Sequence, residues 1–232
     1  MKKILISFFV LLFSFISNAY PPLSPYSYCG GDPVNCIDPT GEDIVVLNFG
    51  NDNMHQHLAM LIQNKDGKWQ YYSVNGNNVY ISGEHTGGRP FNDVAVGSWD
   101  SPQEFLNSSY NVKNDNSKED KSMNNYGFSE GYHIPTTPEQ DAIMRDNFAK
   151  IANTKYNLFT NNCATAVQQV MIDAGIPVSE PTMEPTTIPV STPFGLVDVF
   201  NGYKMKCKIS ILPRIAFRSI MEWNRGGKYL HR

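Results

Sequence analysis

Charged residues, cysteines and long apolar runs are all scarce in this chain of 232 residues. Charged residues make up only 18%, which is low for a cytosolic enzyme. The hydrophobic content of 41% and the aromatic content of 12% are typical of a chain with a folded core rather than a disordered one. A formal net charge of −3 excludes a nucleic-acid binder that works through its overall charge. No internal repeat is present, so the length suggests one domain with extensions.

The longest apolar stretch, residues 4–16, has 13 residues, whereas a membrane-spanning helix needs about 20. It follows two lysines and ends just before a short run of small residues. This order is typical of a signal peptide over residues 1–19 that is cleaved after Ala19. No cysteine stands at the expected cleavage point, which argues against a lipoprotein. We expect a periplasmic or secreted protein whose only membrane contact is through the uncleaved signal.

The four cysteines are Cys29, Cys36, Cys163 and Cys207. In an oxidising compartment an even number suggests two disulfides, and four cysteines allow three pairings. A local bridge between Cys29 and Cys36 fits the turn residues between them, but the sequence does not choose among the pairings. If Cys163 is bridged to Cys207, the protein is a disulfide-stabilised module; if Cys163 is free, its thiol can act as a nucleophile.

Periodicity and turn residues predict an α+β fold in which a small antiparallel sheet packs against helices. Asp-Gly between apolar runs indicates a hairpin, and Thr-Pro-Glu-Gln at residues 137–140 indicates a capped helix start. A long loop is expected over residues 107–131. The expected strands are Ile44–Phe49, Leu58–Ile62, Trp69–Val74, Val79–Ile81, Tyr132–Ile134 and Ile209–Leu212. The expected helices begin at Thr137, near Asn162 and at Ile215.

Cys163 falls in the first turn of one expected helix, directly after two asparagines that can cap it. Unpaired N–H groups and the helix dipole favour a thiolate there, and with a cationic neighbour the pKa falls from ~8.5 to about 3.5–7.5. A thiolate nucleophile needs a base, and His57 at a strand start is the best candidate, with His55 as the alternative. Equally, Cys163 suits a buried structural cysteine or half of a disulfide. No third ligand stands at a familiar metal spacing, so neither a metal nor a cofactor is expected.

The turn-rich residues 20–43 contain a series of short motifs that resembles the end of the RHS repeat-associated core. The matching residues are Pro25, Tyr26, Tyr28, Pro33, Val34, Asn35, Asp38, Pro39 and Gly41. In that family the Asp-Pro-x-Gly word precedes a variable C-terminal effector or toxin domain. The resemblance therefore implies an effector after residue 43, and a neutralising immunity protein as a partner. The long repeat array that normally precedes the word is absent here.

Three later words resemble a permuted papain-like effector domain, in which the histidine precedes the cysteine. They are His57-Leu-Ala-Met-Leu-Ile62, Trp69-Gln-Tyr-Tyr-Ser73 and Tyr156-Asn157 followed by Asn161-Asn162-Cys163. Permuted cell-wall peptidases and enzymes of the lecithin:retinol acyltransferase type share this order. The resemblance covers residues 44–176 and implies Cys163 as nucleophile and His57 as base. Gln56 departs from the small residue usual before the histidine.

The family adds a third polar group that orients the histidine, on the strand after it. If the hairpin closes between residues 64 and 68, residue 75 lies opposite His57. Ser73 and Asn75 share that face and are the candidates, or else ordinary strand-end residues. Trp69, Tyr72 and Asn162 are candidates for substrate binding, although the two aromatic residues equally suit core packing.

The expected organisation is a signal peptide, an RHS-like lead-in over residues 20–43, a catalytic domain over 44–176 and a Pro/Thr-rich, basic extension over 177–232. The predicted function is an exported cysteine hydrolase of polymorphic-toxin type that cuts amide bonds in peptidoglycan peptide or protein. The alternatives are a disulfide-stabilised binding module without catalysis, and an acyltransferase of the same fold.

Overall fold

The computed structural model describes residues 43–49, 56–75, 80–81, 84–85, 92–111, 127–192 and 195–232. The chain divides into two compact units, Met1–Ile37 and Asp38–Arg232, and every described residue belongs to the second. The predicted signal peptide, the RHS-like word up to Gly41, His55, Cys29 and Cys36 therefore lie outside the described residues. Among the described helices, none is long and apolar enough to span a membrane.

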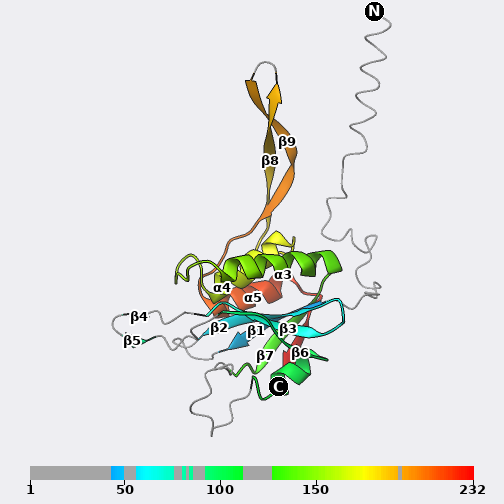
Figure 1. Cartoon of the computed structure of the whole chain (residues 1–232), viewed down its shortest axis with the longest axis vertical. Coiled ribbons are helices and arrows are strands. Elements are labelled where there is room, and N and C mark those ends of the chain that lie inside the picture. Colours follow the sequence, from blue (N-terminus) through cyan, green and yellow to red (C-terminus); the bar gives the residue numbers. More distant parts are fainter. Residues whose placement is uncertain are drawn as a thin grey trace, which may run out of the picture. The chain divides into compact units, whose positions relative to one another are not determined.

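An antiparallel sheet of six strands in the order β10-β7-β1-β2-β3-β6 organises this unit (Figure 1). Its strands are β1 (Asp43–Phe49), β2 (His57–Gln63), β3 (Trp69–Ser73), β6 (Asp93–Trp99), β7 (Glu130–Pro135) and β10 (Lys228–His231). Two strand pairs lie outside it, β4 (Tyr80–Ile81) with β5 (Glu84–His85), and β8 (Thr182–Thr192) with β9 (Gly195–Lys206). The helices are α2 (Pro102–Asn107), α3 (Pro138–Ala152), α4 (Cys163–Asp173) and α5 (Pro213–Trp223). The predicted α+β class is confirmed, but the sheet is larger than the small one expected.

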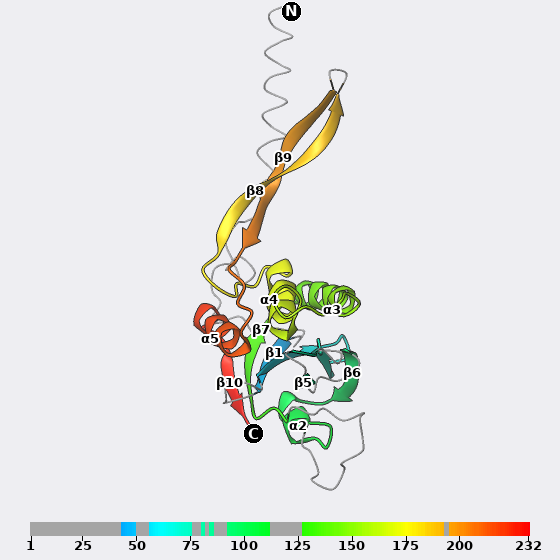
Figure 2. The ribbon, with the colours of Figure 1, turned by 90° about the vertical axis from the view of Figure 1, so that its left-hand side faces the viewer.

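Both faces of the sheet are covered, as Figure 2 shows from the side. Helices α3, α4 and α5 cover one face, where Leu58, Met60 and Ile62 of β2 join their core. The intervening residues Ala59 and Leu61 point to the opposite core, which includes side chains of α2. Because successive side chains of a strand face opposite ways, burial on both sides explains why β1 and β2 are continuous apolar runs.

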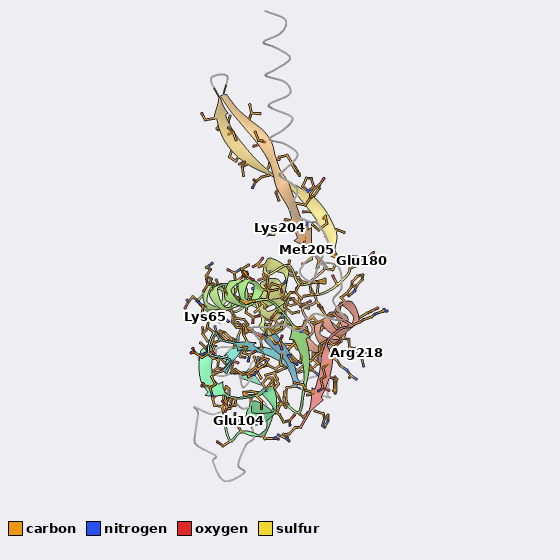
Figure 3. All side chains as sticks on the ribbon, turned by 90° about the vertical axis from the view of Figure 1, so that its right-hand side faces the viewer. Lys65, Glu104, Glu180, Lys204, Met205 and Arg218 are labelled. Carbon is orange, nitrogen blue, oxygen red and sulfur yellow. The ribbon has the colours of Figure 1, made fainter. Side chains whose placement is uncertain are left out.

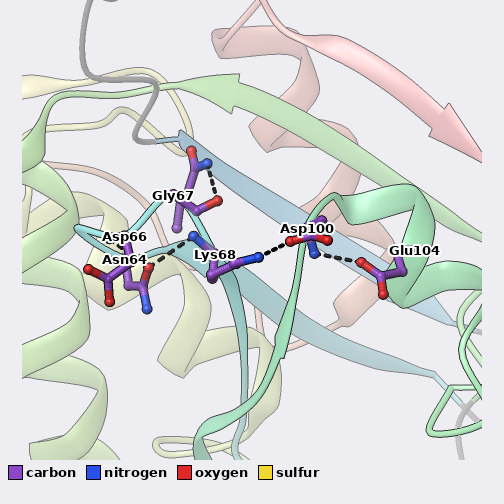
Figure 4. A network of polar contacts seen from close by, with 7 residues as sticks. Asn64, Asp66, Gly67, Lys68, Asp100 and Glu104 are labelled. Atoms are coloured by element: carbon purple, nitrogen blue, oxygen red, sulfur yellow. Dashed lines mark hydrogen bonds and ion pairs between the residues drawn. The ribbon is translucent and has the colours of Figure 1, made fainter.

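The turn between β2 and β3 fixes the register of the hairpin (Figure 4). Asn64 accepts hydrogen bonds on its side-chain Oδ1 from the N–H groups of Asp66 and Lys68 at 3.0 and 2.9 Å. Gly67 has a φ of +74°, a conformation that a residue with a Cβ rarely adopts. Lys68 also pairs with Asp100 at the end of β6. The resulting register pairs Met60 with Tyr72, as the turn position predicted.

Capping residues begin α3 and α4 at the predicted places. Thr137 accepts a hydrogen bond from the N–H of Gln140 at 3.3 Å, and the Gln140 side chain accepts one from the N–H of Thr137 at 3.1 Å. Asn162 and Thr165 form the same reciprocal pair at the start of α4, at 2.9 and 2.8 Å. Each pair satisfies two N–H groups that a helix start leaves without partners.

The C-terminal residues contribute to the same core as β1 and β2. Ala216, Phe217 and Ile220 of α5 are buried in it, and β10 pairs with β7. Helix α5 was predicted from Ile215 and begins at Pro213. The strand predicted over Ile209–Leu212 is wrong, because these residues run without strand pairing from β9 into α5.

Strand β6 and helix α2 were not predicted. Strand β6 contains Ala95 and Gly97, both with positive φ, and its register against β3 shifts twice. These irregularities remove the simple alternation by which a strand is recognised in sequence. A Cβ on Gly97 would lie 2.2 Å from the Trp99 ring, so the tryptophan packs where only glycine leaves room.

Candidate active site

The first of the candidate residues, His57, begins β2 and is almost fully buried, with 4% exposure. Its ring Nε2 lies 2.6 Å from the hydroxyl Oγ of Ser73 on the neighbouring strand β3. It also contacts the ring of Phe128, at 6.1 Å between centroids, on the sheet face opposite helix α4. The predicted pairing of His57 with a polar residue of the next strand is thus present, and the partner is Ser73.

A chain of buried polar groups continues from Ser73 across the sheet. The Ser73 hydroxyl donates to the Oδ1 atom of Asn75 at 2.9 Å, and the Nδ2 group of Asn75 donates to Oδ2 of Asp93 at 2.8 Å. Asp93 stands opposite Ser73 on β6, which explains why this carboxylate reaches the chain. Its other oxygen, Oδ1, accepts a hydrogen bond from the hydroxyl of Tyr110 at 3.1 Å. Both Ser73 and Asn75 have no exposed surface, and Asp93 is also buried.

Cys163 is the first residue of α4 and is a free thiol with 6% exposure. Burial raises the pKa of the Cys163 thiol to about 11, although hydrogen bonds from the backbone N–H groups of Leu58, Ala164 and Cys163 itself act to lower it. The direction is opposite to the lowered pKa expected from the helix start. The correction has a simple cause, because removal from water disfavours a thiolate more than three N–H groups favour it.

The hydrogen bond from Leu58 places the Cys163 thiol beside β2, within one peptide unit of His57. Strands β2 and β3 pair from Met60 and Tyr72 to Gln63 and Trp69, so Leu58 lies beyond the paired part of the hairpin. Since His57 and Leu58 face opposite ways, the thiol and the imidazole approach the start of β2 from its two faces. Burial lowers the pKa of His57 to about 3, so the ring is neutral at physiological pH.

Asn162 joins the start of α4 to the chain around it. Besides capping the helix, its Nδ2 group donates to the carbonyl oxygens of Leu158 and Ile211 at 2.7 and 3.0 Å. The start of α5 is held beside the start of β2, because the side chain of Gln56, just before that strand, accepts a hydrogen bond from the N–H of Arg214 at 3.3 Å. Asn162 was predicted to bind substrate, and in the structure its side chain serves the helix cap and these two carbonyls.

The aromatic candidates for substrate binding are core residues. Trp69 and Tyr72 are both buried, on opposite faces of the sheet. Tyr72 packs on Phe148 of α3 with 5.5 Å between ring centroids. By contrast, Tyr156 packs at the edge of the core close to Cys163, and burial together with that cysteine raises the pKa of its phenol.

The other sulfur and metal predictions can be placed only within the described residues. Cys207 is a free thiol, half-buried against the core, so the described chain contains no bridge between Cys163 and Cys207. In the same residues no three His, Cys, Asp or Glu side chains gather to hold a metal ion.

Asp93 and Tyr110 were missed by the reading of the sequence. Asp93 begins the irregular strand β6, and Tyr110 follows the unpredicted helix α2. A buried carboxylate at the start of a strand has no local signature that distinguishes it from an ordinary turn residue.

Comparison of the chain with protein-family models, with curated proteins and with solved structures found no match.

Proposed function

We propose that this protein is a cysteine hydrolase of the permuted papain-like type, with Cys163 as nucleophile and His57 as general base. One observation carries the proposal: a buried polar chain ends on His57, and the backbone N–H of the next residue, Leu58, lies near enough to the Cys163 thiol to act on its pKa. Burying several polar groups in a sheet is costly unless they are all hydrogen-bonded. The chain meets this condition, and it ends on the histidine that precedes Leu58 in β2.

The raised pKa of Cys163 and the lowered pKa of His57 favour a neutral pair over a preformed thiolate. Catalysis then requires direct contact of thiol and ring, which is the step that the proposal adds. His57 takes the thiol proton while sulfur attacks the carbonyl carbon of an amide. The resulting oxyanion is stabilised by backbone N–H groups at the start of α4. The ring returns the proton to the leaving amine as the C–N bond breaks.

A thioester on Cys163 remains after the amine has left. His57 deprotonates a water molecule, which attacks this thioester. The C–S bond then breaks, and the ring returns the proton to the leaving sulfur. The products are a carboxylic acid and the free thiol, so the enzyme is regenerated. The low exposure of both side chains means that substrate must displace what covers them.

The substrate proposed is an amide bond of peptidoglycan peptide or of a protein. Support for it comes from the likeness to exported effectors, given by the signal-like residues 1–19 and the RHS-like word over residues 20–43. In that setting we propose an immunity protein as partner. The described residues themselves favour no particular amide.

A second candidate, an acyltransferase of the same fold, is favoured by exposed apolar residues near the start of α4. The Asn162 amide binds the carbonyls of Leu158 and Ile211, and the residue after each is exposed and apolar. Phe159 is 73% exposed and Leu212 is 51% exposed. Exposed apolar side chains flanking a nucleophile suit a substrate with an acyl chain better than a polar stem peptide.

The test is hydrolysis of purified peptidoglycan peptides and of an unfolded protein, followed by the appearance of new amino termini. We expect activity in the wild type, loss of at least 100-fold in Cys163→Ala and His57→Ala, and no loss in the matched control Cys207→Ala. Release of an acyl group only when an amine or alcohol acceptor is added would support the acyltransferase. Equal activity in wild type and Cys163→Ala would contradict both.

A further inference from the structure

The hydrogen bonds around Ser73 determine which nitrogen of His57 carries the proton. A serine hydroxyl has one hydrogen, and that of Ser73 is donated to Oδ1 of Asn75. Toward His57 the same oxygen can therefore only accept, so Nε2 of the ring is the donor at 2.6 Å. A neutral imidazole has one N–H, and its other nitrogen, Nδ1, then carries the lone pair.

The direction of the whole chain is set at its far end. The carboxylate of Asp93 accepts hydrogen bonds, so the side chain of Asn75 must turn its Nδ2 group toward it. This leaves Oδ1 of Asn75 facing Ser73, as an acceptor for the hydroxyl. Asn92 holds the backbone in place, because its Oδ1 accepts the N–H of Asn75 at 2.7 Å. Its Nδ2 group donates to the carbonyl of Ala152 at the end of α3, at 2.6 Å.

We propose that Asp93 is a positioning residue that, through Asn75 and Ser73, keeps the His57 proton on Nε2 and makes Nδ1 the basic nitrogen. The inference rests on the proposed function for its catalytic meaning, since Nδ1 is then the atom that takes the Cys163 proton. Asp93 lies at the end of three successive hydrogen bonds that lead from His57 through Ser73 and Asn75. Tyr110 completes the anchor by donating to the second carboxylate oxygen.

Asp93 suits this task because its charge lies where water does not screen it. Ser73 and Asn75 have no exposed surface, so each hydrogen bond in the chain polarises the next. A neutral amide at position 93 could offer either its oxygen or its N–H group to Asn75. The chain would then lose its fixed direction, and the ring would hold its proton on either nitrogen.

The experiment is NMR of the full-length protein with ¹⁵N-labelled histidine, because ring nitrogens with and without hydrogen differ widely in chemical shift. The His57 signals are assigned from the spectrum of His57→Gln. In the wild type we expect the proton on Nε2. In Asp93→Asn and Asn75→Ala we expect the ratio of the two tautomers to shift toward Nδ1–H by about tenfold, the value of one hydrogen bond.

Asp100→Asn is the matched control, because the exposed Asp100 carboxylate pairs with Lys68 at the opposite end of β6 from Asp93 (Figure 4). This change should leave the His57 spectrum as in the wild type. A wild-type ring protonated on Nδ1 would overturn the inference even if no variant folds. So would an unchanged tautomer in both Asp93→Asn and Asn75→Ala. The NMR readout does not require Cys163. Hydrolysis can therefore be absent in the assays above while the tautomer result holds, and the tautomer result can fail while hydrolysis is observed.

Discussion

The six-stranded sheet and the β8–β9 hairpin are built from similar apolar and β-branched residues but reach opposite states. In the sheet, Val46, Met60 and their neighbours have no exposed surface, because helices cover one face and α2 with Phe128 covers the other. In the hairpin, side chains project from both faces (Figure 3), and Leu196 and Phe200 are 77% and 57% exposed. A run of apolar and β-branched residues therefore indicates a strand, while the burial of that strand depends on what packs against it.

The two regions also differ in how they are held together. The hairpin is a single pair of strands, a structure that is only marginally stable alone in water. Pro185 and Pro189 of β8 have no N–H to donate to a neighbouring strand. The candidate site lies in the sheet, where burial on both faces fixes His57 and Ser73. The following predictions test this contrast, starting with the largest effect.

Truncation of a side chain in the covered sheet should be severe. Phe148 of α3 is fully buried against Tyr72. Phe148→Ala should lower the free energy of unfolding by about 3–5 kcal/mol, because it removes apolar contact and leaves a cavity. Urea unfolding followed by circular dichroism measures the change. The matched control is Ile143→Ala on the same helix, where the side chain is 41% exposed and the loss should be below about 1 kcal/mol.

Acid should destabilise the sheet region through His57. The pKa of His57 is lowered by burial from 6.5 to about 3, so the folded state holds the ring neutral. The neutral ring contributes to the free energy of unfolding fully above pH 6.5, and this contribution is lost as pH falls toward 3. The loss is on the order of 4 kcal/mol. In His57→Gln the free energy of unfolding should fall less steeply over this range. Parallel pH profiles for the two proteins would contradict the burial of a neutral ring.

Substitution in the exposed hairpin should have the smallest effect. Phe200 contacts Tyr203 edge-on at 5.2 Å and is otherwise largely in solvent. Phe200→Thr keeps a residue suited to a strand and should change the free energy of unfolding by less than about 0.5 kcal/mol. The same urea measurement serves as the readout. A loss comparable with that of Phe148→Ala would show that the hairpin is covered in solution and would remove the contrast.

Local signals were the ones that could be predicted from the sequence. Asn64 and Gly67 determine the β2–β3 turn and hence the pairing of Met60 with Tyr72, so Ser73 and Asn75 were found by counting along the strands. Thr137 and Asn162 cap their helices through neighbours three residues away. Each of these features depends on a few consecutive residues.

Features that depend on distant contacts could not be predicted. Strand β10 pairs with β7 across almost a hundred residues, joining Lys228 with His133. Asp93 reaches the site only because the irregular β6 pairs with β3. The predicted direction of the Cys163 pKa shift was wrong for the same reason. The helix start is a local feature, but the burial that outweighs it depends on tertiary contacts.

The central claim is that Cys163 is a nucleophile activated by His57, and acyl transfer from 4-nitrophenyl acetate to the full-length protein tests it most directly. We expect mass spectrometry at neutral pH to find a thioester on Cys163 in preference to the more exposed Cys207. Its formation should slow by at least tenfold in His57→Ala. Acetylation of Cys207 alone, or of Cys163 at a rate that does not depend on His57, would contradict the account.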